Sequence, residues 1–324
     1  MNELRALSPD ASGSGAASGN GVLAPLPDTY YNRPLLKKPH WEWEVISYLF
    51  LGGVMGGSGI IVALTDDRKD PDLARSARYL AFALAATCPL ILIKHLGRPE
   101  RFHHMLRVVK FRSAMSMGVW GLIAFSLPAG LGALGQASRD GLLPRWIASL
   151  APRAITDLLS ALFGAFIGGY TGVLLSSTAI PVWGIGKRHI PSFSVCSGVA
   201  SACAANALIL ALSGGSERSM KKVERFEFVA SIAELAILLH FERHAGTLGA
   251  PMFGGARGAR LRRYTQIGGI AVPALLSLLP LHGRWKTALS SLLTLHGGYV
   301  LRETLIEGGK GSSEDPRAAS RQPE

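Results

Sequence analysis

Long apolar blocks dominate this sequence and limit what it can fold into. Eight blocks are separated by charged or Pro/Gly-rich breaks, and they cover residues 43–64, 75–94, 113–135, 155–180, 193–212, 226–241, 264–281 and 285–305. A helix needs roughly 20 residues to cross ~30 Å of hydrocarbon, and it satisfies its own backbone groups without water. The pattern therefore predicts an all-α integral membrane protein with about eight transmembrane helices.

A soluble all-α protein is the competing interpretation, since 48% hydrophobic content alone does not exclude it. Several blocks, however, exceed the usual length of a helix buried in a soluble core. The blocks at residues 75–94, 226–241 and 264–281 are the weakest of the eight.

The two ends of the sequence differ from the apolar blocks. Residues 1–40 are rich in Ser, Gly, Ala and Pro, which predicts a disordered tail leading into an interfacial strap, without the apolar core of a signal peptide. Residues 41–307 form the predicted membrane domain, and residues 308–324 a second disordered tail.

The net charge of +12 does not indicate nucleic-acid binding, but the positions of the positive residues predict the membrane topology. The cations lie in loops between the apolar blocks, and no nucleic-acid recognition motif surrounds them. With eight spans, the side shared by both termini carries the larger number of Lys and Arg residues. The positive-inside rule then predicts that both termini lie in the cytoplasm.

The three cysteines, Cys88, Cys196 and Cys203, all lie inside apolar blocks without CxxC spacing. Neither a disulfide framework nor an iron–sulfur cluster is therefore expected.

Two blocks contain glycines at four-residue spacing. The first block carries Gly52, Gly53, Gly56, Gly57 and Gly59, and the fourth carries Gly164, Gly168 and Gly172. Small residues at this spacing allow membrane helices to approach closely, so both sets predict packing surfaces.

Alternation of the spans places most polar candidates at one membrane face. These residues are His40, Glu42, Glu44, His95, Arg98, Trp183, His240, Glu242 and Arg302, with Glu234 and His296 deeper. Ionisable groups at membrane depth are costly and usually serve a pathway or site. We therefore expect one polar cavity that opens toward this face, with His95 and Glu234 as catalytic proton carriers. Ligand-binding residues would be His40, Glu44, His95, Arg98 and Arg302.

Acids, histidines and arginines of this kind suit a quinone, whose oxygens need hydrogen-bond donors and proton acceptors. A b-type cytochrome subunit is an alternative, although two histidines would have to meet at one depth on facing helices. A proton-coupled transporter is another alternative, although the halves show no inverted repeat of motifs.

Four motifs carry a resemblance to a known family. They are WEWE at residues 41–44 followed by LGG at 51–53, LGRPERF at 96–102, MSMGVW at 115–120 and YTGVLL at 170–175. Leu301-Arg302 followed by GGK at 308–310 also fits. Over nearly all of its length outside the tails, the sequence resembles the NrfD family of polysulfide-reductase-like membrane subunits.

The resemblance implies eight helices in two four-helix bundles that bind quinol, menaquinone or ubiquinone, without a metal or haem of their own. It also implies an iron–sulfur partner subunit with a molybdopterin catalytic subunit beyond it, and proton transfer in addition to electron transfer. Arg98 and Arg101 match the LGRP segment of the family, and Arg302 matches its last-span arginine.

One position departs from the family pattern. Relatives commonly have Asp immediately before LGRP, whereas this sequence has His95. The replacement keeps a group that exchanges protons, with an ordinary pKa of ~6.5, but it reverses the charge of the ionised form.

Overall fold

Helices make up almost all of the structure, a computed structural model that describes residues 36–279 and 283–314. Within these ranges there is no strand. All described residues belong to one compact unit. Of the tails predicted at residues 1–40 and 308–324, the parts at residues 1–35 and 315–324 lie outside the described residues, so disorder there stays a prediction.

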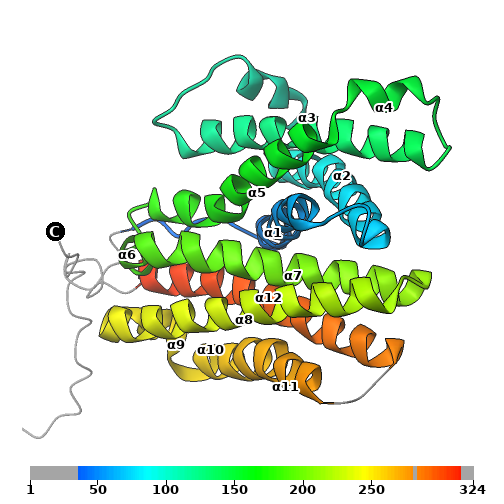
Figure 1. Ribbon diagram of the computed structural model, residues 1–324. Helices are drawn as coiled ribbons and strands as arrows, with labels where there is room; N and C mark the ends of the chain where they lie inside the picture. Colours follow the sequence, from blue (N-terminus) through cyan, green and yellow to red (C-terminus); the bar gives the residue numbers. More distant parts are fainter. Residues whose placement is uncertain (1–35, 280–282, 315–324) are drawn as a thin grey trace, which may run out of the picture. The chain divides into compact units, whose positions relative to one another are not determined.

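Eight long helical segments run through the described part of the protein (Figure 1). They are α1 (Trp43–Leu64), α2 (Pro71–His95), α3 (Ala114–Arg139), α5 (Arg153–Ser176), α7 (His189–Ser213), α8 (Glu217–Ala245), a continuous run of α10 (Gly255–Arg260), η4 (Leu261–Ala271) and α11 (Val272–Leu278), and α12 (Arg284–Glu314). The shorter elements are η1 (Pro99–Leu106), α4 (Trp146–Leu150), α6 (Pro181–Ile185), η2 (Gly186–Arg188), η3 (Gly246–Gly249) and α9 (Ala250–Phe253).

Five helical stretches among the described residues are long and apolar enough to cross a membrane. These are α1, α2, α3, α5 and the stretch Pro181–Ser213 that contains α6 and α7. The predicted membrane class is confirmed, including the weak block at residues 75–94. The same measure does not include α8, the α10–α11 run or α12, so the count of eight spans stays a prediction.

The long helices contact one another in two groups of four. The first group contains α1, α2, α3 and α5, and the second contains α7, α8, the η4–α11 run and α12. Helix α1 also packs along α7 and therefore joins the two groups. Figure 1 shows α7, α8 and α12 side by side, with α1 beside α7.

Glycines account for the close packing of α1, as predicted. A Cβ atom added at Gly56 would collide with the backbone carbonyl of Gly164 on α5. One added at Gly57 would lie 2.5 Å from the carbonyl oxygen of Gly198 on α7. Two neighbours thus touch α1 backbone to backbone, which only glycine permits at these positions.

The second glycine set packs α5 against α7, which confirms its predicted role. The Cβ position at Gly168 lies 3.5 Å from the Cα atom of Val195, and at Gly172 it overlaps Pro191. One row of glycines therefore lies on each of two neighbouring helices, and each row contacts the backbone of an adjacent helix.

Contacts between distant segments define the membrane face at which residues 36–42 lie, here called the strap face. Lys38 Nζ forms an ion pair with Glu314 Oε1 at the end of α12, at 2.8 Å. Lys94 Nζ, at the end of α2, lies 4.7 Å from the ring centre of Trp43 at the start of α1. These contacts confirm the predicted alternation for α1, α2 and α12.

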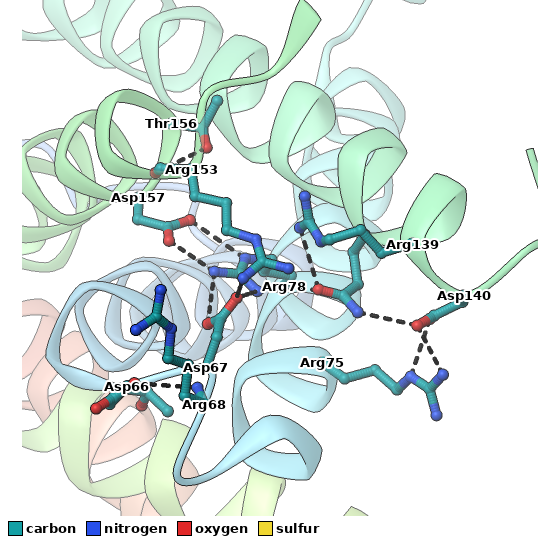
Figure 2. Close-up of polar contacts among 12 residues, drawn as sticks. Asp66, Asp67, Arg68, Arg75, Arg78, Arg139, Asp140, Arg153, Thr156 and Asp157 are labelled. Carbon is teal, nitrogen blue, oxygen red and sulfur yellow. Dashed lines mark hydrogen bonds and ion pairs between the residues drawn. The ribbon is translucent and has the colours of Figure 1, made fainter. Parts of the chain in front are cut away.

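The opposite face, here called the far face, carries a buried ionic cluster around Arg78 (Figure 2). Arg78 is 3% exposed, and its guanidinium donates to Asp67 at 2.9 Å and to Asp157 at 2.6 Å. Gln136 accepts a further bond at 2.9 Å. One side chain therefore joins the α1–α2 loop, α2, α3 and α5.

Asp140, just after α3, extends this cluster at its rim. Burial raises the pKa of its carboxyl, but hydrogen bonds from Arg75, Tyr79 and Gln136 outweigh that effect and lower the pKa below its ordinary value. The carboxylate therefore stays ionised at neutral pH and accepts bonds from both α2 and α3.

The last helix extends beyond the boundary predicted for the membrane domain. The sequence predicts disorder from Gly308, but α12 continues to Glu314. Gly309 packs on the ring of Trp183, and Ser312 Oγ accepts a bond from the Val182 backbone nitrogen at 3.3 Å. The predicted boundary is therefore corrected by one to two helical turns. Composition alone indicated flexibility, whereas these small residues allow α6 to pack on the helix.

Gly56→Ala should destabilise the protein by about 1–3 kcal/mol, because the added methyl group displaces a backbone carbonyl rather than a flexible side chain. Gly184→Ala is the matched control, since its Cβ position has no atom within 4 Å. Thermal unfolding in detergent measures both. Equal midpoints for the two variants would contradict the packing argument.

Arg78→Gln should destabilise the protein by about 3–5 kcal/mol, because it removes the buried cation between two half-buried carboxylates and leaves Asp157 without an ion-pair partner, while Asp67 keeps only Arg153. Arg68→Gln, at an exposed position in the same loop region, should have little effect. Denaturation in the same detergent compares them, and a stable Arg78→Gln protein would show that the cluster is dispensable.

Candidate functional site

A cavity of about 350 Å³ lies at the strap-face end of the first helix group. Its walls come from α1, α2, η1, α3 and α5. The lining is mainly aliphatic and aromatic, including Leu92, Leu122 and Phe102. Such a volume and lining are typical of sites for small molecules with a flat, apolar body.

Four polar side chains line this otherwise apolar cavity, and one of them, Ser126, donates its hydroxyl hydrogen to the Leu122 carbonyl oxygen of its own helix at 2.7 Å. His95 is half-buried at the end of α2, and Tyr48 on α1 is 4% exposed. Tyr170 on α5 donates its hydroxyl hydrogen to the Ala114 carbonyl oxygen at 2.8 Å. No described residue forms a hydrogen bond with the Tyr48 hydroxyl. The cavity thus offers an imidazole and two phenol oxygens to a ligand.

The position of Tyr170 depends on a glycine in the MSMGVW motif. A Cβ atom added at Gly118 would overlap the ring and hydroxyl of Tyr170. Gly118 therefore gives the phenol room to reach the first turn of α3, where Ala114 accepts its hydrogen bond. Ser113 caps this turn by accepting a bond from the Ser116 nitrogen at 3.4 Å.

The cavity is bordered by apolar side chains that are themselves exposed. Leu127 is 64% exposed, Met115 50%, Phe102 41% and Leu106 40%, and all four line the cavity. Apolar side chains at the surface of a membrane helix bundle face lipid. A ligand with a hydrocarbon tail could therefore keep that tail in the bilayer.

Trp41 closes the cavity on the side of the second helix group. Its ring stacks on that of Trp183, with centroids 5.2 Å apart and planes 15° apart. Trp183 is fully buried and donates its indole hydrogen to the Leu305 carbonyl oxygen on α12 at 3.0 Å. The cavity wall is thereby connected to both helix groups.

The other predicted ligand-binding residues near the strap do not line this cavity. His40 is highly exposed and lies 3.2 Å from Glu42. Glu44 is half-buried in the first turn of α1, with one oxygen that has no hydrogen-bond partner. Arg98 is exposed just before η1.

The remaining two predicted site residues, Glu234 and Arg302, lie together in the second helix group. Glu234 on α8 is 3% exposed, Arg302 on α12 is 2% exposed, and the two interact electrostatically. Arg302 also reaches α1, since its Nη2 atom is 3.5 Å from the Cβ position of Gly53. The residues expected to share one polar cavity thus lie in different places: His95 lines the cavity in the first helix group, and Glu234 and Arg302 are buried in the second.

Several histidines gather at the strap face of the second group. The ring of His189 lies 5.1 Å from that of His240 and 5.2 Å from that of His244, centre to centre. His296, expected at depth, lies on an exposed surface of α12 beside Tyr264. Within the described ranges, no group of three or more His, Cys, Asp or Glu residues is placed to hold a metal ion.

Sequence reasoning missed the two tyrosines of the cavity. Tyr170 lies in the YTGVLL motif, whose glycine indicates helix packing, and Tyr48 lies in an apolar block without a charged neighbour. Phenols are common in membrane helices, so only the placement of both at one cavity distinguishes them.

Comparison with known proteins identifies a matching protein family. The profile of the family described as "Polysulphide reductase, NrfD" matches residues 35–310. This range contains the described helices almost completely, including every residue that lines the cavity.

Two known proteins are similar to this sequence. Protein NrfD of Escherichia coli strain K12 is 25% identical over 224 residues, which cover 62% of the present protein and 70% of that relative. The C subunit of polysulfide reductase from Wolinella succinogenes is 26% identical over 184 residues, or 52% of the present protein. The match spans 57% of that relative's length.

Proposed function

We propose, because the protein belongs to the NrfD polysulphide reductase family, that it is the membrane-anchor subunit of a respiratory oxidoreductase complex that exchanges electrons with quinol. In this proposal the 350 Å³ cavity beside His95 holds the quinone ring, and the isoprenoid tail lies in the bilayer. The membrane subunit itself supplies binding and proton exchange, and its partners supply the redox centres.

One observation carries the proposal. Four sequence motifs that lie far apart in the sequence all contribute to the same cavity: Trp41 from WEWE, Phe102 from LGRPERF, Gly118 from MSMGVW and Tyr170 from YTGVLL. Their convergence on an apolar space with a few polar groups supports a ligand function for the motifs. Packing alone would not require them to border one cavity.

The polar groups match the chemistry of a quinol ring. Oxidation of a quinol to the quinone releases two electrons and two protons. A neutral His95 can accept a hydrogen bond, and then a proton, from one hydroxyl of the ring. The free hydroxyl of Tyr48 can donate to the other oxygen of the ring.

The electrons would leave through an iron–sulfur subunit docked at the strap face, with a molybdopterin catalytic subunit beyond it. The exposed segment of η1 supports docking there, since Arg98 and Arg101 form no ion pair with any described residue. Exposed arginines of this kind suit an acidic partner surface. We place the complex in the bacterial plasma membrane with both termini in the cytoplasm.

His95→Leu should lower quinol-dependent electron transfer in the assembled complex by about 10²–10⁴-fold, because it removes the proton acceptor of the ring hydroxyl. The measurement is steady-state oxidation of a soluble quinol analogue by the purified complex. His104→Leu is the matched control, since His104 is exposed on η1 and does not line the cavity. Unchanged turnover in His95→Leu would remove His95 from the reaction.

Leu122→Trp should weaken quinone binding by tenfold or more, about 1.4 kcal/mol, because the indole would fill the cavity that Leu122 lines. Quenching of tryptophan fluorescence by a titrated naphthoquinone reports the dissociation constant. Leu131→Trp controls for the new fluorophore, since Leu131 is exposed on the same helix away from the cavity. Equal affinity in both variants would place the ligand elsewhere.

A further inference from the structure

The second helix group contains a column of buried polar groups that the quinol cavity does not use. On α8 the residues recur at spacings of three and four, which places them on one side of the helix. They are Glu224, Glu227, Ser231 and Glu234. On α12 the matching polar residues are Thr287, Ser291, Thr294 and Arg302.

Hydrogen bonds join the two helices along this column. Thr287 Oγ1 donates to Glu224 Oε1 at 2.6 Å, and Thr294 Oγ1 donates to Glu227 Oε1 at 2.7 Å. Glu224 is half-buried, and Glu227 is only 6% exposed. The column thus passes from a partly exposed carboxyl to a buried one within a single helical turn.

The inner end of the column is Glu234 with Arg302. Arg302 Nη2 donates to the Ser194 carbonyl oxygen at 3.1 Å, while its Nε and Nη1 atoms are buried without a partner. Glu234 interacts with Arg302 electrostatically, yet the two form no ion pair within 4.0 Å. A guanidinium at this depth with two free donors is costly unless water completes its hydrogen bonds.

The outer end of the column opens at the far face. A cleft of about 150 Å³ there is lined by residues that include Arg284, Glu224 and Thr287. A second, narrower space of about 10 Å³ is lined by Glu227, Ser231 and others. That volume admits about one water molecule. Room for about one water molecule therefore lies beside Glu227 and Ser231, and both spaces are lined by Glu224.

Toward the strap face the column is closed by apolar side chains. Leu238, Phe241 and Phe193 are all 0% exposed and follow Glu234 in that direction. One to two turns of helix separate Glu234 from Phe241, or about 10 Å. The next polar side chain on α8 after Glu234 is His240, which is exposed rather than buried in this layer.

A purely structural role would be to hold α8 to α12 by hydrogen bonds. That role explains the Thr294–Glu227 contact, but it explains neither the unpartnered nitrogens of Arg302 nor Ser291 Oγ, which is also buried without a partner. Rows of carboxyl and hydroxyl groups with room for water are the usual form of proton relays inside membranes.

We propose that the second helix group contains a one-sided proton path that leads from water at the far face to Glu234. A proton passes from water to the Glu227 carboxylate, and then through water and the Ser231 hydroxyl to the Glu234 carboxylate. Arg302 stabilises the ionised form of Glu234 by its charge. Each transfer moves one proton between oxygens, and no electron is involved.

The first test needs no quinol and uses the full-length protein in sided lipid vesicles, with its three cysteines replaced by alanine. Thr294→Cys is placed on the path, and silver ions, which are about as small as water, are added on one side at a time. Free silver is then removed from solution and the protein is denatured. A fluorescent maleimide now labels only those thiols that silver did not protect.

We expect loss of maleimide labelling when silver is added at the far face, and full labelling when it is added at the strap face. Leu238→Cys, in the apolar layer, is the matched control and should stay unprotected from either side. The proposed path would be wrong if silver protected Thr294→Cys from neither side, or if silver added at the strap face protected it.

The second test measures proton movement by the whole complex in vesicles during quinol turnover. Glu227→Gln and Glu234→Gln should lose proton uptake from the far face, whereas Glu242→Gln should keep it. Glu242 lies on the same helix but pairs with Arg262 near the surface. Unchanged uptake in the first two variants would contradict the path, while absent quinol turnover in the unaltered complex would count only against the proposed redox function.

Discussion

Close approach of α1 to two helices at once is the constraint on which the rest of the structure depends. Membrane helices gain little from apolar contact alone, since lipid is as apolar as leucine, so they associate through close backbone packing. Gly56 faces Gly164 on α5, and Gly57 faces Gly198 on α7. Because α1 is held on both sides, the two helix groups share one wall, and each encloses its own polar residues.

This shared wall separates two kinds of chemistry. The first group holds a cavity that is mostly apolar, with Tyr48, His95 and Tyr170 at its polar points, and it is bordered by side chains that face lipid. The second group holds Glu234 and Arg302, buried among helices and approached through hydroxyl and carboxyl groups. A lipid-soluble ligand suits the first arrangement, and small polar species suit the second.

The two faces of the first group are stabilised differently. At the far face, Arg78 holds four segments through charged hydrogen bonds (Figure 2), which makes that end rigid. Around the cavity at the strap face, contacts are mainly aromatic and apolar, as in the stack of Trp41 on Trp183. The cavity lies at this end, where side chains can shift to admit a ligand without breaking buried ion pairs.

The sequence by itself determined the membrane class, the helix-packing glycines and the family, because block length, residue spacing and motifs are local properties of the sequence. It also indicated Glu234 and His95 as unusual groups. Only the tertiary structure decided that they lie in different helix groups, that two tyrosines line the cavity with His95, and that α12 continues past Gly308. These features depend on which helix faces meet, and rotation of a helix about its axis is set by packing with its neighbours rather than by its own composition.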